Sequence, residues 1–263
     1  MNEQLDIIYR DKFLVAINKP SGLLVHRSAI DRHETRFAMQ MLRDQIGQHV
    51  FPVHRLDKPT SGVLVFALSA EIAALMGNIF AEHRLQKTYV AIVRGIAPEY
   101  QLLDYPLIEE LDKYTAPIHN TRQARTPEAK PAITEFFRIA DVALPYSVDK
   151  YPESRYSLVK CVPQTGRKHQ IRRHLKHLSH PIIGDAKHGK GNHNRFFQQT
   201  FNAHRLLLAA TELSFTHPVT QIELKLIAPL DATIAQLIER FGWYNAVPHQ
   251  WLPSLEQNKP YAP

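Results

Sequence analysis

The sequence predicts an α+β protein, with a mixed and mainly antiparallel β-sheet flanked by helices. Eight runs of β-type residues stand against four helical patterns, so helices do not alternate one for one with strands, as they would in a doubly wound parallel sheet. Most neighbouring runs are joined by short turns, which is typical of antiparallel pairing. The chain has 263 residues, 44% of them apolar, enough to fill the core of one large domain or two small ones.

The expected strands are short runs rich in β-branched, aromatic and other apolar residues. In chain order they cover residues 5–9, 13–18, 63–68, 88–93, 132–142, 156–162, 206–215 and 222–227. The expected helices carry apolar residues three and four positions apart, which places a buried stripe on each of them. They cover residues 35–46, 70–84, 168–178 and 231–241.

No internal repeat and no Gly/Ser linker divides the chain, so we expect a single domain over residues 1–263. The polar stretch 113–130, which contains Pro117 and Pro127, is expected to be a long excursion between two strands.

The charge distribution favours a polyanionic partner. The net charge is +7, and the segment 166–195 carries eight Lys or Arg and six His against one acid, Asp185. The single cysteine, Cys161, cannot form an intramolecular disulfide or a Cys-x-x-Cys metal pair, which fits a reducing cytoplasm. The N-terminus has no apolar signal region and no apolar run approaches about 18 residues, so we expect neither secretion nor membrane spanning.

Two segments carry the residues of chemical interest. Residues 54–62 read His-Arg-Leu-Asp-Lys-Pro-Thr-Ser-Gly and connect a short apolar approach to the strand 63–68. Asp57 thus lies between two cations in a strand-to-strand loop, although a hairpin turn selects the same residue types. Residues 165–174 read Thr-Gly-Arg-Lys-His-Gln-Ile-Arg-Arg-His and by themselves indicate a basic helix start in contact with phosphates. Arg172 lies at the edge of that helix's apolar stripe, where it can face a cleft.

Both segments resemble the signature motifs of the RluA-type pseudouridine synthases. The resemblance extends through residues 18–22, 180–189 and 205–218 and so covers nearly the whole chain. It implies the pseudouridine synthase fold with a central active-site cleft, with Asp57 as the catalytic residue and Arg172 as its partner. It also implies that Tyr89, in Lys-Thr-Tyr at the start of the strand 88–93, stacks on the target base and accepts its C5 proton. The Lys-Pro-Ser-Gly turn at 19–22 supports the site without taking part in the chemistry.

The remaining site residues are expected to contact RNA. Arg55, beside the catalytic loop, would occupy the space that an extruded base leaves. The other expected contacts are His54, Arg167, Lys168, His169 and Arg173. We expect no metal and no cofactor, because the six His of the basic segment form no recognisable ligand set and no phosphate-binding Gly-rich motif is present.

Further segments at 24–28, 44–51, 104–113 and 241–243 are similar to the TruC branch of the family, which modifies uridine 65 of transfer RNA (tRNA). That branch lacks the small N-terminal RNA-binding domain of some relatives, and we expect none here, since the first strand begins at once. We expect a cytoplasmic monomer. A ribosomal RNA synthase of the same family and a non-catalytic RNA-binding protein are the alternatives. The motifs do not decide whether Asp57 attacks C1′ or removes the 2′ proton.

Overall fold

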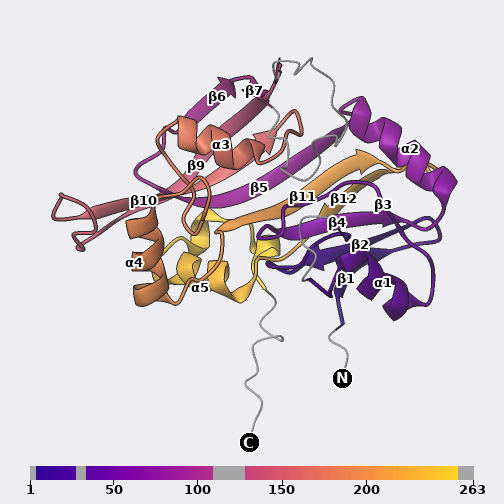
Figure 1. Cartoon of the computed structure of the whole chain (residues 1–263), viewed down its shortest axis with the longest axis horizontal. Helices are drawn as coiled ribbons and strands as arrows, with labels where there is room; N and C mark the ends of the chain where they lie inside the picture. Colours follow the sequence, from indigo (N-terminus) through magenta and orange to yellow (C-terminus); the bar gives the residue numbers. More distant parts are fainter. Residues whose placement is uncertain (1–3, 28–33, 109–127, 254–263) are drawn as a thin grey trace, which may run out of the picture.

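The computed structural model describes residues 4–27, 34–108 and 128–253. Its centre is a ten-stranded sheet in the order β1-β2-β4-β11-β5-β10-β9-β6, with β12 beside β11 and β3 beside β4 (Figure 1). The strands are β1 (Asp6–Arg10), β2 (Leu14–Lys19), β3 (Phe51–Pro52), β4 (Ser61–Ala67), β5 (Leu85–Arg94), β6 (Tyr100–Asp104), β9 (Ile133–Leu144), β10 (Ser154–Pro163), β11 (Leu208–Thr216) and β12 (Glu223–Ile227). A separate two-stranded ribbon pairs β7 (Leu107–Ile108) with β8 (Ala129–Lys130).

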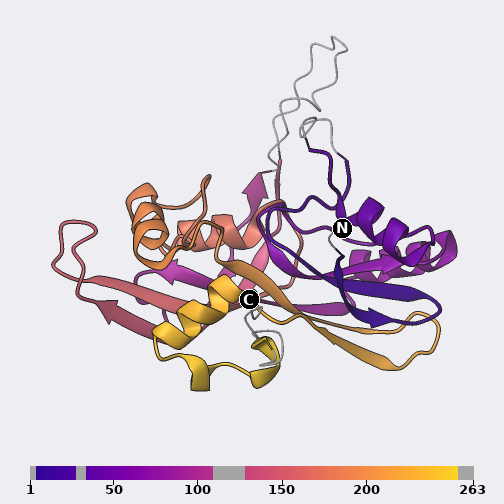
Figure 2. The ribbon, with the colours of Figure 1, turned by 90° about the horizontal axis from the view of Figure 1, so that it is seen from below.

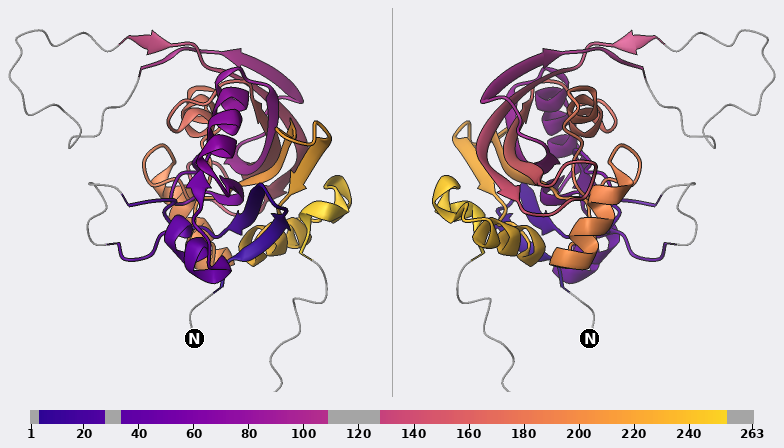
Figure 3. Two further views of the ribbon diagram at one scale, coloured as in Figure 1. Left: turned by 90° about the vertical axis from the view of Figure 1, so that its right-hand side faces the viewer. Right: turned by 90° about the vertical axis from the view of Figure 1, so that its left-hand side faces the viewer.

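The sheet is mainly antiparallel, as the sequence predicts. Within it, only β4 and β11 of the described strands pair in parallel, through Ala209 with Ser61 and Ala210 with Gly62. Strand β11 therefore lies between two strands, β4 and β5, that come much earlier in the chain. Seen along its length in Figure 3, the sheet is strongly curved, as expected from the right-handed twist of its strands.

Five helices pack against this sheet. They are α1 (Ala38–Ile46), α2 (Ala70–Ala81), α3 (Gln170–His177), α4 (Gly191–Phe201) and α5 (Ala232–Arg240). Helices α1 and α2 bury apolar residues against β2 and β4, while α3, α4 and α5 pack at the half of the sheet formed by β5 and β10. Figure 2 shows the two groups of helices at opposite ends of the molecule. The mixed sheet and its flanking helices confirm the predicted α+β class.

The helix ends follow from local side chains. Ser69 caps α2 by accepting a hydrogen bond from the backbone N–H of Ile72. Asp231 caps α5 by accepting from the N–H groups of Thr233 and Ile234. Helix α1 ends where Gly47 adopts the left-handed conformation, which costs a glycine nothing.

Several expected boundaries were wrong. Strand β5 begins at Leu85 rather than at residue 88, so Tyr89 lies within the strand and not at its opening. Helix α2 ends at Ala81 rather than at residue 84, and His83 just beyond it has a positive φ of 55°. Helix α3 begins at Gln170, because His169 before it has a positive φ of 56° and cannot continue a helix backwards.

Several elements were missed. Among them are strand β6, which forms the edge of the sheet beside β9, the two-residue strands β3, β7 and β8, and helix α4, which begins within the basic segment 166–195. Of the expected excursion 113–130, residues 113–127 lie outside the described residues, and only its end, at β8, is seen. The single domain and the central active-site cleft stay predictions. None of the described helices is long and apolar enough to cross a membrane.

Gly62 is the tightest point of the parallel pair. Its φ is 113°, and a Cβ built there would collide with the carbonyl group of Ala210. We predict that Gly62→Ala destabilises the fold by roughly 3 kcal/mol or more, from backbone strain together with overpacking. Thermal unfolding followed by circular dichroism measures the change.

Gly77→Ala is the matched control. Gly77 lies in the middle of α2, and nothing stands within 4 Å of an added Cβ. That substitution should stabilise the protein by about 0.5–1 kcal/mol, because alanine loses less backbone freedom in a helix. Equal unfolding temperatures for the two variants would show that β4 and β11 do not approach as closely as described.

Candidate active site

The loop between β3 and β4 presents Asp57. The backbone N–H of Thr60 donates a hydrogen bond of 3.0 Å to the carbonyl of Asp57, which closes a tight turn. Leu56, one position earlier, is buried in the apolar cluster of α1, which anchors the loop. The side chain of Asp57 remains 22% exposed, so the loop offers a fixed carboxylate that a substrate can reach.

Arg172 of α3 contacts that carboxylate. Its Nη1–H donates to Asp57 Oδ2 at 2.9 Å, across 115 positions of sequence. Its Nε–H and Nη2–H donate to the two oxygens of Asp185 at 2.7 and 2.9 Å, a bidentate contact that fixes the plane of the guanidinium. Within the described residues Asp57 Oδ1 accepts no hydrogen bond, so the two oxygens of this carboxylate differ.

The charges of this triad stabilise one another. Burial opposes the charge of Arg172, but the hydrogen bonds and charges of Asp185 and Asp57 outweigh it and raise the pKa of the guanidinium. Burial likewise acts to raise the pKa of Asp185, but hydrogen bonds from Arg172 and from the backbone N–H groups of His188 and Lys187 lower it overall. Asp185 therefore serves as a fixed anion that orients Arg172.

Gln170 holds the start of α3 in place. Its side-chain oxygen accepts from the Thr165 hydroxyl at 2.8 Å and from the Arg167 N–H at 2.9 Å. Its amide donates to the carbonyl of Ile133 and to the Thr134 hydroxyl on β9. The basic loop before α3 is thus tied to the sheet, which sets the direction in which the helix projects Arg172.

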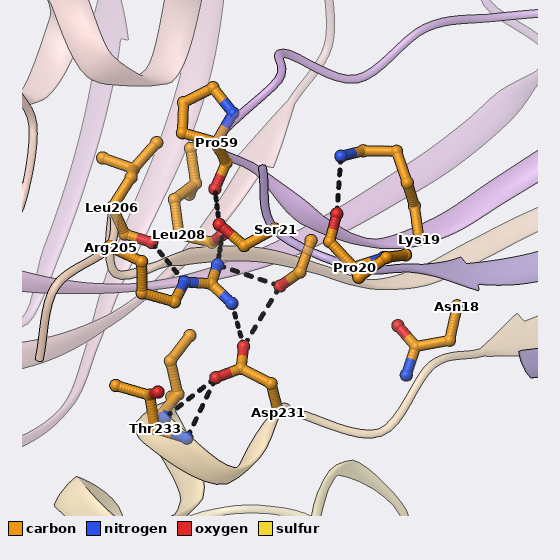
Figure 4. Close-up of polar contacts among 12 residues, drawn as sticks. Asn18, Lys19, Pro20, Ser21, Pro59, Arg205, Leu206, Leu208, Asp231 and Thr233 are labelled. Atoms are coloured by element: carbon orange, nitrogen blue, oxygen red, sulfur yellow. Dashed lines mark hydrogen bonds and ion pairs between the residues drawn. The ribbon is translucent and has the colours of Figure 1, made fainter. Parts of the chain in front are cut away.

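Lys19, at the end of β2, holds the Asp57 loop in place. It is fully buried, and its Nζ donates to the carbonyls of Pro20, Leu23 and Lys58 at 2.9, 2.8 and 3.2 Å. Ser21 adds a hydrogen bond to the Pro59 carbonyl at 2.8 Å (Figure 4). Burial, and then the charge of Arg205, lower the pKa of Lys19 to about 7, while Asp57 opposes that shift. The Lys-Pro-Ser-Gly turn thus lies against the Asp57 loop.

Arg205 forms a second support. Figure 4 shows its guanidinium beside Asp231, to which it donates through Nη1. Its Nη2 donates to the Ser61 hydroxyl at 3.0 Å. It also donates to the carbonyls of Leu206 and Leu208. Since Ser61 opens β4 directly after the catalytic loop, this cluster joins the loop to the segment that precedes β11 and to the cap of α5.

Tyr89 lies where the two halves of the sheet meet. Its ring packs against the apolar cluster of α1 and also against that of α3. Burial, then the charge of Asp57, then Cys161 raise the pKa of the Tyr89 phenol well above its ordinary value. Asp57, Arg172 and Tyr89 therefore come from a loop, a helix and a strand. Asp57 connects them, since it contacts Arg172 and its charge acts on the Tyr89 phenol.

The expected RNA contacts divide into two groups. Arg55 is exposed beside Asp57, Arg167 donates to the Pro131 carbonyl at 3.0 Å, and Arg173 donates to the Ile108 carbonyl at 2.9 Å. Lys168 is half-buried in the loop before α3. These four lie on or beside the loop and helix that carry Asp57 and Arg172.

His54 and His169 are placed differently from these four residues. His54 Nε2 accepts a hydrogen bond from the Val65 N–H at 3.0 Å, and the ring stacks on Phe80. Burial, and then the charge of Lys87, lower the pKa of His54 to about 3, so it carries no charge for a phosphate. His54 thus holds the loop against β4, and its expected RNA contact stays a prediction that a neutral ring could meet only through a hydrogen bond. His169 points at Asp57, with its Nε2 3.7 Å from Oδ2.

Sequence reasoning assigned no role to Asp185 or Arg205. Asp185 is the only acid in the basic segment, a signal that could have drawn attention to it. Among the residues that the structure describes, no group of three or more His, Cys, Asp or Glu is placed to hold a metal ion. The expectation of no metal and no cofactor stays a prediction.

Comparison with known proteins gives the family. A family model described as RNA pseudouridylate synthase matches residues 13–177, more than half of the chain and including Asp57, Tyr89 and Arg172. The chain belongs to the RNA pseudouridylate synthase family. The predicted membership is confirmed.

Individual relatives cover almost the full length. A protein of Vibrio parahaemolyticus named tRNA pseudouridine synthase C is 55% identical over 240 residues, which are 91% of this chain and 96% of that protein. One of Haemophilus influenzae with the same name is 50% identical over 241 residues, 92% of this chain and 99% of that protein.

Solved structures of the family share the fold. Human RNA Pseudouridylate Synthase Domain Containing 1 matches with a TM-score of 0.67 at 25% identity, covering 97% of this chain and 93% of its own. Human RNA Pseudouridylate Synthase Domain Containing 4 matches with a TM-score of 0.66 at 26% identity, covering 90% and 93%.

Arg172 should not tolerate replacement by lysine. We predict that Arg172→Lys lowers the single-turnover rate of pseudouridine formation on the order of a hundredfold, because an ammonium cannot hold Asp185 and Asp57 together in one plane. Arg167→Lys should lower that rate much less, since the hydrogen bond that it alters is the one from Arg167 Nε–H to the Pro131 carbonyl. A fully active Arg172→Lys enzyme beside an inactive Arg167→Lys enzyme would assign the pairing to the other arginine.

Proposed function

We propose that this protein isomerises uridine 65 in the T-stem of tRNA to pseudouridine. The names of its close relatives support tRNA as the substrate, and the branch-like segments support the position. The observation that carries the catalytic assignment is the carboxylate of Asp57, which is 22% exposed, with Oδ2 held by Arg172 and Oδ1 accepting no hydrogen bond from the described residues.

The reaction needs no external atoms. The bond from N1 to C1′ breaks, the uracil rotates, a bond from C5 to C1′ forms, and the C5 proton leaves while N1 gains one. Asp57 Oδ1 either attacks C1′ or removes the 2′ proton to give a glycal, and both routes fit a partly exposed carboxylate whose other oxygen is held. We propose that this chemistry proceeds without metal or cofactor.

Access to C1′ requires the nucleotide to leave its stack, which costs a few kcal/mol. Arg55, exposed beside Asp57, is placed to fill the space that the base vacates. Tyr89 lies against the extruded base and accepts the C5 proton. Because the pKa of its phenol is raised, Tyr89 is protonated in the free enzyme, so it first gives its own proton to uracil N1 and then accepts the proton from C5.

The same proposal covers the rest of the molecule. Residues 1–263 form one catalytic domain that works as a cytoplasmic monomer, with Arg55, Arg167, Lys168 and Arg173 holding the RNA backbone. A ribosomal RNA synthase would share the catalytic residues, so only the substrate separates the two functions. A non-catalytic RNA-binding protein would have no use for the Asp57–Arg172–Asp185 arrangement.

Asp57→Asn tests the catalytic assignment. We predict no detectable pseudouridine, with tRNA affinity within a few fold of the wild type, because the substitution removes the nucleophile or base with little change of shape. Single-turnover assays and filter binding measure the two quantities, after mass spectrometry has excluded deamidation back to Asp. Substantial turnover would remove Asp57 from the mechanism.

The substrate is tested with transcripts that carry tritium at uracil C5. A tRNA with uridine at position 65 should release tritium, and the same tRNA with cytidine there should not, since the docked RNA shape and the extruded base decide which uridine reacts. Release from a ribosomal RNA fragment alone would move the protein to the ribosomal branch and leave the Asp57 chemistry intact.

A further inference from the structure

Two histidines stand beside Asp57 and have no part in the reaction as described. His169 Nε2 lies 3.7 Å from Asp57 Oδ2, and His169 Nδ1 lies 3.0 Å from His188 Nε2. Both residues are mostly buried. The backbone N–H of His188 donates to Asp185 Oδ1 at 2.8 Å, so the carboxylate that orients Arg172 also fixes the turn that carries His188.

The backbone of His169 is unusual for its position. It is the N-cap of α3 with a φ of 56°, a conformation that side chains other than glycine seldom adopt. N-cap side chains normally accept a hydrogen bond from the first turn, but His169 makes no such bond. The ring points instead toward Asp57 and His188, so this backbone serves to place an imidazole at the carboxylate.

The surroundings of His169 favour a neutral imidazole. Burial is the main cause that lowers its pKa to about 4; the charge of Asp57 opposes the shift, and the charges of Arg172, His188 and Lys187 add to it. A neutral imidazole carries one N–H, so one ring nitrogen donates and the other accepts. A proton on Nδ1 would turn the lone pair of Nε2 toward the Asp57 carboxylate, which is repulsive. A proton on Nε2 is attracted to that carboxylate.

We propose that His188 sets the tautomer of His169, donating from its Nε2–H to His169 Nδ1 so that the His169 Nε2–H faces Asp57 Oδ2. His169 is then a positioning residue that, with Arg172, holds Oδ2 and leaves Oδ1 to react. The separation of 3.7 Å is too long for a hydrogen bond in the free enzyme, but such contacts tighten in the substrate complex. This inference rests on the proposed function, in which Asp57 performs the chemistry.

The experiment compares three variants in single-turnover assays at saturating tRNA, with affinity measured separately. His188→Leu removes the donor and should lower the rate about tenfold or more at unchanged affinity. His188→Gln, whose amide can donate to His169 Nδ1, should retain most of the rate. His169→Asn keeps a residue type that tolerates a positive φ but lacks the imidazole, and should match His188→Leu. His249→Leu, an exposed site far from the loop, is the control for loss of a histidine.

A second readout needs no activity. Nitrogen-15 NMR of the free wild-type protein labelled in histidine should show His169 neutral with its proton on Nε2, the signal being assigned by its absence in His169→Asn. A proton on Nδ1, or unchanged rates in both His188→Leu and His169→Asn, would overturn the proposal. So would weakened binding with an unchanged rate at saturation, since His169 would then be an RNA contact. A wild-type protein that forms no pseudouridine would refute the proposed function, while the tautomer measurement would still judge the histidine pair.

Discussion

The site depends on one guanidinium held between two carboxylates. Asp185 takes two N–H groups of Arg172 and so prevents the side chain from turning, which leaves Nη1 to contact Asp57. Without Asp185 the guanidinium that holds Asp57 Oδ2 could itself rotate. A buried charge triad of this kind contributes little to folding free energy, because desolvation opposes the Coulomb attraction. Its value is geometric, since it makes the two oxygens of Asp57 unequal: Oδ2 is held, and Oδ1 is the one to which we assign the chemistry.

Two buried cations near the Asp57 loop, Lys19 and Arg205, show the same balance between desolvation and favourable polar contacts. Both are largely removed from water. Lys19 donates to backbone carbonyls around the loop, whereas Arg205 donates to two carbonyls at the start of β11 and to the side chains of Asp231 and Ser61. For Lys19 the loss of solvation is large enough to lower the pKa to about 7. Placing positive charge near the Asp57 carboxylate therefore costs solvation free energy. Functional sites are the places where sequences depart in this way from the rules of core packing.

The sequence predicted the elements better than their contacts. The sheet, its mainly antiparallel pairing and four of five helices follow from periodicity, since alternation and helical spacing are local properties. Helix α4 was not predicted because Gly191 and two asparagines lower its helix propensity. It is held against the core by the buried Phe197, a tertiary contact that local patterns do not reveal. The contact of Asp57 with Arg172 spans 115 positions, and only likeness to a family could suggest it.

Other failures at the site have equally physical causes. A motif does not say which way a side chain points, so His54 seemed to belong with Arg55 but instead accepts a hydrogen bond from β4. Asp185 was visible as a lone acid among cations, but its two contacts with Arg172 depend on how the turn after α3 folds back. The expected helix 168–178 placed His169 in its first turn, whereas its positive φ keeps it outside the helix, which begins at Gln170, and its ring lies 3.7 Å from the Asp57 carboxylate.

The position of β11 sets the order in which the enzyme can assemble. Strands β4 and β5 are neighbours in the chain, but β11, made much later during synthesis, must enter between them. Until then both strands expose unpaired edges, and Ser61, at the end of the catalytic loop, lacks its contact with Arg205. A nascent chain on the ribosome is therefore without a finished active site, although Asp57, Tyr89 and Arg172 have all emerged. Such long-range pairing closes large loops at an entropic cost, so folding should be slow and complete only once the C-terminal half is free.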